Sequence, residues 1–386
     1  MATATAKSPG RERISADAFF TRLADADQRR IRRLRLLDVL LNKTRLCLFG
    51  YGGKGRSLAH HIARIHGRDL LIFDSNPMAR KRARAEGFAV VDDFTQIDTN
   101  QTATILGACQ AQAEQAGVVG RNFIYYQEAA YIFDLPFLFD SNRAFTDCIL
   151  PLRDDLYTIY CRVHPDSQRA LLDVLCFRLS LDPSDLAGSR RLNSDMWFDQ
   201  FERYSMRPYR TFLDVGAYDG DTLASAKQRL GVSRGIAVEA NDSLFPRIEE
   251  VASGFTDGIS ILPMAAWSHD CKLTFEEVRG GMIRVYEDPL GSLQAAAIDS
   301  AITEHVDLVK MDIEGAELEA LRGACRIFHA SQPDLAIAAY HRPLDLIEFF
   351  NFLDGNGLSM DYARLDVAHY SDCFDDTILY CLRQAN

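Results

Sequence analysis

The chain has 386 residues, a formal net charge of -11 and 47% hydrophobic residues. This length predicts two domains, each large enough to bury its own core. The composition excludes a disordered or fibrous protein, and the acidic charge argues against a general nucleic-acid or anionic-membrane binder.

The nine cysteines stand singly, without a C-x-x-C pair or a cluster with histidines. We therefore expect no disulfide scaffold and no zinc site, and a reducing compartment fits best. No apolar run reaches the length of a signal-peptide core or of a membrane span. These features predict a cytoplasmic protein without a membrane partner.

Residues 1–43 are expected to form an N-terminal helical segment behind a short tail. One helix should begin near Ser15 or Asp17, and a second, basic helix should follow a charged stretch and run from about Arg29 to Leu41. The arginines of this second helix could form an RNA or phosphate surface, but a solvated helix face is the favoured interpretation.

Residues 44–140 alternate between apolar runs and helix-like segments, which predicts a Rossmann-like domain with a parallel sheet. The runs expected as strands are 46–49, 70–74, 88–91 and 102–106.

A G-x-G-x-x-G pattern follows the first of these strands directly and precedes a helix-like segment, and an aspartate closes the next strand, 19 residues beyond its last glycine. This is the context that a dinucleotide-binding turn requires. The pattern predicts a second nucleotide site for NAD or a nucleotide sugar, with two basic residues available to a diphosphate. The alternative is a Rossmann-like fold without a ligand that serves for packing or docking. The predicted site residues are Gly50, Gly52, Gly55 and Asp74, and the basic residues are Lys54 and Arg56.

Residues 141–205 are predicted to be a largely helical connector, broken at Asp182-Pro183-Ser184, that could also act as a substrate lid. Residues 206–386 form a second alternating unit, predicted as a doubly wound α/β domain with a seven-stranded sheet. Its expected strands are 211–215, 235–239, 259–263, 306–312, 334–340, 358–365 and 376–382, and its expected helices are 221–230, 243–252, 315–328 and 343–355.

The first strand of this unit ends in a glycine turn that runs into a helix. Ligands of open α/β sheets bind at the carboxyl ends of the strands. No lysine follows, so the turn is not a Walker phosphate loop. Its three carboxylates would repel a pyrophosphate but suit the cationic donor S-adenosylmethionine, and an acid at the end of the next strand could bind ribose hydroxyls. An acidic turn that merely caps the helix is the alternative. The predicted cofactor-binding residues are Asp214, Gly216, Ala217, Tyr218, Asp219, Gly220, Glu239 and Ala240, with Asp221 as the third acid of the turn.

A further strand, 306–312, ends in charged residues at the same edge of the sheet. Lys310, Asp312 and Glu314 stand there, and chemistry is expected at such a strand end. An internal ion pair that neutralises the strand end is the alternative for Lys310 and Asp312.

Together these motifs resemble the FkbM family of methyltransferases. The resemblance covers about 205–386 and rests on Asp214 to Ala217, Glu239, Ala297 to Asp299, Val306 to Glu317 with Leu321, Gly323 and Ala324, and Tyr340-His341. It implies a class I fold, S-adenosylmethionine as donor and methylation of a hydroxyl oxygen on a sugar, glycan precursor or secondary metabolite. The sequence departs from the family at Tyr218-Asp219, where Asn-x-Gly is common.

Transfer of a methyl group to a hydroxyl requires alignment of the reactants and removal of one proton. Asp312, Glu314 and His341 are the candidates for the base or for substrate orientation, and Lys310 could hold a carboxylate or stabilise an alkoxide. His341 could instead be a turn residue satisfied by the backbone. We predict no metal site, although Asp312 and Glu314 could instead bind magnesium.

Two further functions stay open at this point. One is an oxidoreductase whose first domain binds NAD, and the other is a non-catalytic nucleotide-sugar-binding scaffold. The expected partner is a small-molecule or glycan acceptor, and a homo-oligomer is compatible with the sequence.

Overall fold

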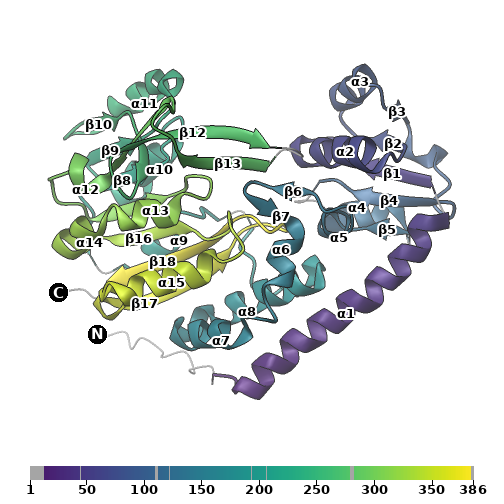
Figure 1. Ribbon diagram of the computed structural model, residues 1–386, viewed down its shortest axis with the longest axis horizontal. Coiled ribbons are helices and arrows are strands. Elements are labelled where there is room, and N and C mark those ends of the chain that lie inside the picture. Colours follow the sequence, from purple (N-terminus) through teal and green to yellow (C-terminus); the bar gives the residue numbers. More distant parts are fainter. Residues whose placement is uncertain are drawn as a thin grey trace, which may run out of the picture.

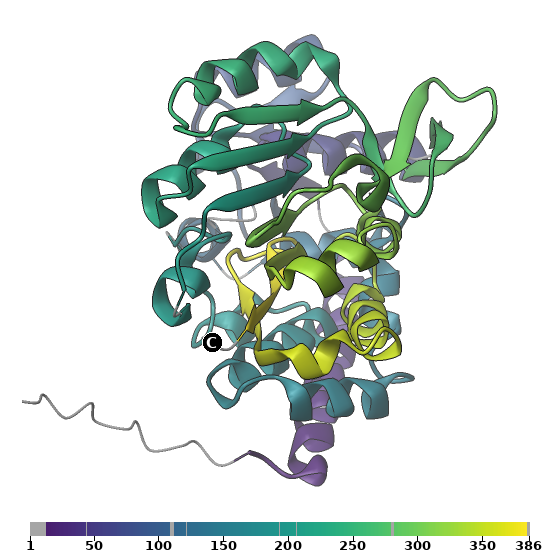
Figure 2. The same ribbon diagram turned by 90° about the vertical axis from the view of Figure 1, so that its left-hand side faces the viewer.

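The computed structural model describes residues 13–43, 45–108, 112–120, 122–192, 194–205, 207–278 and 282–383. Two α/β lobes lie side by side, and one long helix, α1 (Ala16–Lys43), runs along both of them (Figure 1). Seen from the side, the strands of the C-terminal lobe form a twisted sheet with helices on its faces (Figure 2).

The N-terminal lobe contains a five-stranded parallel sheet in the order β3-β2-β1-β4-β5. This is the strand order of a Rossmann-like half, so the predicted fold class is confirmed here. The strands are β1 (Arg45–Phe49), β2 (Leu70–Phe73), β3 (Ala89–Val90), β4 (Thr102–Leu106) and β5 (Phe123–Ile124), and the helices are α2 (Gly53–His66), α3 (Pro77–Ala85), α4 (Gln112–Val119) and α5 (Tyr126–Ile132).

The expected pair of N-terminal helices is wrong, because α1 is a single helix of 28 residues. No glycine or proline interrupts the charged stretch in its middle, and Asp27 pairs there with Arg30 at 2.6 Å. The buried Phe19 and Leu23 near its start join the core of the C-terminal lobe, whereas Leu37 joins the core of the N-terminal lobe. The helix therefore packs on both lobes.

The expected connector is helical in the structure. A short hairpin precedes its helices, and the largely buried α8 packs between α1 and strand β17 of the C-terminal sheet. The elements are β6 (Pro136–Phe137), β7 (Asp140–Ser141), α6 (Asn142–Asp147), α7 (Arg153–Arg162), α8 (Pro165–Ser180) and α9 (Asp199–Tyr204).

The C-terminal lobe contains a sheet of seven strands, as predicted, and their order is β10-β9-β8-β15-β16-β18-β17. The first five strands are parallel, and β18 runs antiparallel to both of its neighbours. The strands are β8 (Thr211–Val215), β9 (Arg234–Val238), β10 (Ile259–Leu262), β15 (Leu308–Met311), β16 (Asp334–Ala338), β17 (Tyr362–His369) and β18 (Thr377–Arg383). The helices are α10 (Asp221–Leu230), α11 (Phe245–Ala252), α13 (Glu317–Arg322), α14 (Cys325–Ser331) and α15 (Asp345–Gly355), and 3-10 turns occupy Phe94–Gln96, Pro183–Leu186, Asp242–Leu244 and Leu358–Asp361.

The helix expected over 315–328 is two helices, α13 and α14. Gly323 separates them, and a β-carbon at this position would overlap the carbonyl oxygen of Trp267. Only a glycine allows the backbone to approach this closely.

A four-stranded sheet between β10 and β15 was not predicted. It pairs β11 (Ala265–Trp267), β14 (Leu293–Ala297), β12 (Cys271–Val278) and β13 (Met282–Glu287) in that order, and α12 (Ile298–Ala301) follows. The β12–β13 hairpin extends away from the main sheet (Figure 2). Its alternation of polar and apolar residues differs from the continuous apolar runs that identified the other strands.

Two further expectations concern cysteines and membranes. Seven cysteines of the described residues are free thiols, but Cys373 is disulfide-bonded, which the single spacing of the cysteines did not indicate. Among the helices that the structure describes, none combines the length and the apolar character needed to cross a bilayer.

Candidate active site

The glycine turn after β8 lies directly against the end of β15. Gly216 has a φ of +82°, and a β-carbon there would overlap the main-chain carbonyl oxygen of Asp312. The Asp312 amide donates a hydrogen bond to the carbonyl oxygen of Val215 at 3.0 Å. The turn predicted to bind the cofactor and the residue predicted to act in catalysis are therefore in backbone contact.

Glu239, directly after β9, fixes the outer part of this turn. One carboxylate oxygen accepts from the amide of Tyr218 at 2.9 Å, and the other accepts from the amide of Asn241 at 2.8 Å. Tyr218 itself has a φ of +49° and an exposed side chain. Each oxygen of Glu239 keeps a second lone pair, so the half-buried carboxylate can still accept from a ligand hydroxyl.

Asp214 and Lys310 form a buried ion pair beneath the turn. Their side chains are 0% and 4% exposed, and the Lys310 Nζ lies 3.1 Å from the Asp214 Oδ1. Lys310 also donates to the carbonyl oxygen of Gly216 at 2.6 Å, and the Thr222 hydroxyl donates to Asp214. Burial opposes the charged form of Lys310, but the charges of Asp214 and Asp312 outweigh it and raise its pKa.

The internal ion pair that the sequence left open is thus present, but Lys310 forms it with Asp214 instead of Asp312. Both side chains are shielded from solvent by the turn above them. Asp214 and Lys310 are therefore positioning residues, which stabilise the glycine turn and do not face the ligand.

The remaining acids of the turn lie at its outer end. Gly220, with a φ of +84°, is the N-cap of α10, and Asp221 accepts from the amide of Thr222 at 2.7 Å. Asp219 lies 3.4 Å from a guanidinium nitrogen of Arg247. Asp221 is therefore an acid in the first turn of α10, where the helix dipole favours a negative charge, while the partly exposed Asp219 still faces solvent.

Three carboxylates surround the imidazole of His341, which follows β16 and is 2% exposed. Its Nδ1 lies 2.8 Å from the Oε1 of Glu317, and its Nε2 lies 3.4 Å from Asp312 and 3.6 Å from Glu314. The structure thus brings the predicted Asp312, Glu314 and His341 together. The backbone-satisfied turn residue left open for His341 does not fit these contacts.

Sequence reasoning missed Glu317 as a site residue. This carboxylate is buried in the first turn of α13 and accepts from the amide of Ile313 at 2.8 Å as well as facing His341. An acid in the first turn of a helix is usually explained by the helix dipole, so its position alone gave no signal. Burial lowers the pKa of His341, but the charges of Glu317, Asp312 and Glu314 outweigh this and raise it to about 9.

Asp312 and Glu314 are the solvent-facing acids of this cluster. The Asp312 side chain is 25% exposed and accepts from the Tyr340 hydroxyl at 3.2 Å, whereas the Glu314 side chain is 70% exposed. Glu314 has a φ of +58°, a rare backbone conformation for a non-glycine residue. Strain of this kind occurs at functional sites.

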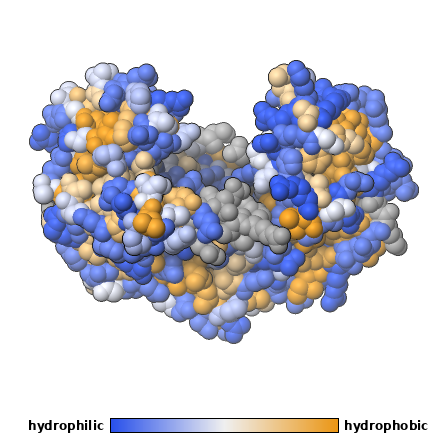
Figure 3. Space-filling model, turned by 45° about the horizontal axis from the view of Figure 1, so that its top comes forward, coloured by the Kyte–Doolittle hydropathy of each residue, from blue (hydrophilic) through white to orange (hydrophobic). Residues whose placement is uncertain are grey.

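The β6–β7 hairpin covers the loop next to Glu314. A β-carbon on Gly315 would overlap the ring of Phe139, and the guanidinium of Arg342 lies over that ring at 4.4 Å while donating to the carbonyl of Gly315 at 2.7 Å. The hairpin belongs to the N-terminal half of the chain. Both halves therefore line this edge. The molecular surface is hollowed between the two lobes (Figure 3).

The glycine turn of the N-terminal lobe is built in the same way. Gly50 donates to the carbonyl of Phe73 at 2.8 Å, as Gly216 donates to that of Val238 at 2.9 Å. The Asp74 carboxylate accepts from the amides of residues 51 and 76 at 2.6 and 2.7 Å, which matches the two amide bonds of Glu239. A β-carbon on Gly55 would overlap the carbonyl oxygen of Gly50, and Gly52 is the N-cap of α2.

The basic residues expected at a diphosphate have other partners. Lys54 pairs with Asp375 of the C-terminal lobe, and Arg56 lies 2.9 Å from Glu86. Glu86 also accepts from the buried Tyr51 hydroxyl at 2.6 Å.

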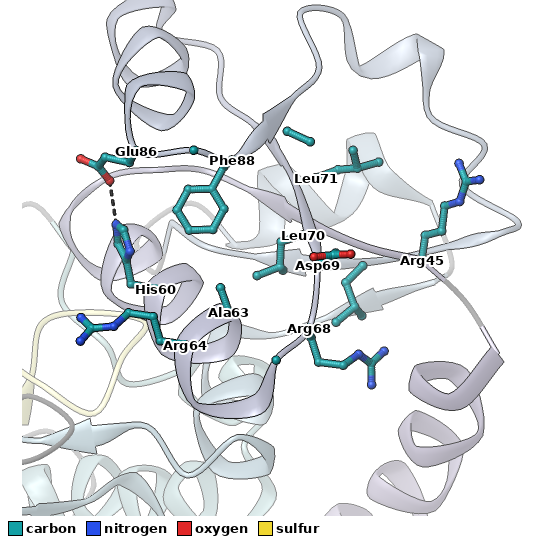
Figure 4. Close-up of a pocket in the computed structure, with 14 residues that line it drawn as sticks. Arg45, His60, Ala63, Arg64, Arg68, Asp69, Leu70, Leu71, Glu86 and Phe88 are labelled. Atoms are coloured by element: carbon teal, nitrogen blue, oxygen red, sulfur yellow. Dashed lines mark hydrogen bonds and ion pairs between the residues drawn. The ribbon is translucent and has the colours of Figure 1, made fainter.

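The large pocket of this lobe, about 1000 Å³, lies by the starts of β1 and β2, between α2 and β3 (Figure 4). It is lined there by Arg45, Arg64 and Arg68, whereas nucleotide sites lie at the opposite, carboxyl ends of the strands. This pocket therefore gives no support to the second nucleotide site.

Comparisons with known proteins agree with this description. Residues 283–362 match the family model of the methyltransferase FkbM domain, a segment that contains Asp312, Glu314 and His341. No curated protein sequence matches the chain.

Among solved structures, methyltransferase FkbM from Methylobacillus flagellatus KT is 21% identical, with a TM-score of 0.71 over 95% of this chain and 98% of that one. The ribosomal protein L11 methylase from Lactobacillus delbrueckii subsp. bulgaricus is 17% identical and has a TM-score of 0.30 over 48% of this chain and 75% of that one. The first of these matches shows that both lobes belong to a shared fold.

The strand order and these matches show that the chain has a Rossmann-like α/β fold similar to that of methyltransferase FkbM. Within this fold, residues 283–362 are similar to the methyltransferase FkbM domain, and this segment contains part of the motifs that resemble the family.

Proposed function

We propose that this protein transfers the methyl group of S-adenosylmethionine to a hydroxyl oxygen of a small molecule or glycan. The contact between Gly216 and Asp312 is the observation that carries this proposal. It brings a turn suited to the donor within reach of a carboxylate suited to deprotonate the acceptor.

The donor would lie across the carboxyl ends of β8 and β9. The backbone of Gly216, Ala217, Tyr218 and Gly220 would line it, Glu239 would accept from the ribose hydroxyls, and Ala240 would lie beside them. Asp219, partly exposed at the end of the turn, would attract the cationic end of the donor.

Asp312 is the proposed base. Its side chain reaches solvent, whereas His341 is almost fully buried and tied to Glu317. As the hydroxyl oxygen attacks, the carbon–sulfur bond breaks, the carbon–oxygen bond forms, and the hydroxyl proton passes to Asp312. S-adenosylhomocysteine leaves, and the protein contributes alignment and proton removal.

The N-terminal lobe has a structural role in this proposal. The Lys54–Asp375 pair ties it to the loop between β17 and β18, and Arg56 is held by Glu86. A site for NAD or a nucleotide sugar at Gly50, Gly52, Gly55 and Asp74 would require both basic side chains to change partners.

Calorimetry of the full chain with S-adenosylmethionine, S-adenosylhomocysteine, NAD and nucleotide sugars tests this assignment. We expect binding of the first two alone. Binding of NAD without the methyl donor would favour the oxidoreductase, and binding of a nucleotide sugar without turnover would favour the scaffold.

A further inference from the structure

The cluster at His341 has a feature that methyl transfer by a base alone does not use. The Nε2 of this buried imidazole makes no hydrogen bond within the described residues, yet it faces two carboxylates, Asp312 at 3.4 Å and Glu314 at 3.6 Å. Both distances are longer than the donor–acceptor distance of a good hydrogen bond.

These distances suit two ligands of one metal ion. Imidazole nitrogen and carboxylate oxygen bind divalent cations at about 2.0 to 2.2 Å, so ligand atoms around one ion stand roughly 3.0 to 3.5 Å apart. The Asp312 distance lies within this range. Among the described residues of this cluster, the ligand atoms of Asp312, Glu317 and His341 lie within 4.8 Å of one another, so Glu314 must move toward Asp312 to share an ion, which its 70% exposed side chain allows.

Glu317 binds the other ring nitrogen of His341. Its Oε1 lies 2.8 Å from Nδ1, the ring nitrogen that the other two acids do not face, and accepts a hydrogen bond from the Ile313 amide. Metal-bound histidines commonly donate their other ring N–H to a carboxylate, which directs the second nitrogen toward the ion. With Nδ1 bonded to Glu317, Nε2 is directed at Asp312 and Glu314, and a metal ion that binds there displaces the Nε2 proton.

We propose that Asp312, Glu314 and His341 bind one divalent cation of the manganese, iron or zinc type. One imidazole and two carboxylates with open positions form a set that such ions accept, and the exposed faces of both acids leave room for a further ligand. This proposal differs from our expectation of no metal site. It also differs from the magnesium alternative, because it combines two acids with an imidazole nitrogen.

The role of the ion rests on the proposed function. A hydroxyl oxygen of the acceptor occupies an open position, where the cation lowers its pKa and orients it toward the donor. A carboxylate that binds the ion through one oxygen keeps the other, so the hydroxyl proton still passes to Asp312. The methyl group then moves from sulfur to oxygen.

Titration of the full chain with Mn²⁺, after removal of metals with EDTA, tests the inference. The electron paramagnetic resonance signal of free Mn²⁺ reports binding without any turnover. We expect one bound ion per chain, and an affinity reduced at least about tenfold in Asp312→Asn and Glu314→Gln, whose side chains reach solvent and whose replacement leaves the core intact.

His269→Ala is the matched control, because His269, Cys271 and Glu287 form a second metal-compatible group among the described residues, beside the group of Asp312, Glu317 and His341. This variant should bind Mn²⁺ as the unmodified chain does. Absence of binding by the metal-free chain, unchanged affinity in both acid variants, or loss of binding in His269→Ala alone would each overturn the inference.

Calorimetry with S-adenosylmethionine on the same metal-free protein separates the two proposals. Donor binding without Mn²⁺ binding removes the metal site and leaves the proposed function. Mn²⁺ binding without donor binding removes the proposed function and leaves the metal site.

Discussion

The carbonyl oxygen of Asp312 occupies the space that a β-carbon on Gly216 would need. This contact joins the end of β15 to the turn after β8, so neither segment can move without the other. Donor site and catalytic cluster are therefore one structural unit, and changes at the contact should affect both.

Gly216→Ala should abolish detectable binding of S-adenosylhomocysteine while the protein stays folded. The added methyl group forces the turn away from Asp312, and a φ of +82° is unfavourable for alanine. Calorimetry measures the loss and circular dichroism the fold. Gly53→Ala is the control, since a β-carbon there meets no atom within 4 Å, and equal affinity of both variants would contradict the prediction.

Lys310→Met should lower the free energy of unfolding by about 3 to 5 kcal/mol, because it leaves the carboxylate of Asp214 buried without its partner. Urea denaturation measures the change. The double variant Lys310→Met with Asp214→Asn should recover part of the loss. A single-variant loss below about 1 kcal/mol would show that the pair does not hold the turn.

Glu317→Gln should weaken Mn²⁺ binding about 10-fold to 100-fold, because the amide no longer attracts the Nδ1 proton as a charge does. Affinity for S-adenosylmethionine should stay unchanged, since Glu317 does not line the donor turn. Glu319→Gln on the same helix is the control, because its partner is Arg322 at the surface. Equal losses in both variants would point to a general effect on α13.

Acid should weaken the N-terminal lobe through Glu86. Hydrogen bonds from Arg56, Tyr51 and His60 lower its pKa to about 2, below its value in the unfolded chain, about 4.3. A carboxylate with a lowered pKa in the folded state stabilises that state above the unfolded pKa, and the contribution is lost as the pH falls toward 2.

The urea midpoint of the unmodified chain should therefore fall between pH 4.5 and pH 2.5 more steeply than that of Glu86→Gln. The exposed Glu249→Gln controls for the removal of one carboxylate. Parallel pH profiles for the unmodified chain and Glu86→Gln would contradict the prediction.

Much of the fold follows from local sequence patterns. Continuous apolar runs located the strands of the C-terminal sheet and four of the five strands of the N-terminal sheet, because helices cover both faces of such sheets. They missed the two-residue strand β5. The break at Gly323 could not be predicted, since it depends on contact with Trp267, which lies 56 residues away in the chain. The single helix α1 was obscured by its charged middle, which packing on two lobes stabilises.

Local sequence patterns also predicted part of the candidate site. Asp312 and Glu314 follow a strand, so their place at the sheet edge is a local property. The pairing of Lys310 with Asp214, of Lys54 with Asp375 and of Glu317 with His341 depends on segments far apart in the chain. Sequence reasoning therefore identified the residue types, while the partners required the structure.

The central claim is the transfer of a methyl group from S-adenosylmethionine to a hydroxyl oxygen. The most direct measurement incubates the full chain, with and without Mn²⁺, with donor labelled in the methyl group and a pool of hydroxylated sugars, glycans and small metabolites. Mass spectrometry should find the label on an oxygen of an acceptor, and Asp312→Asn should not produce it. Label on nitrogen or carbon, or the same O-methylated product from Asp312→Asn, would contradict the account.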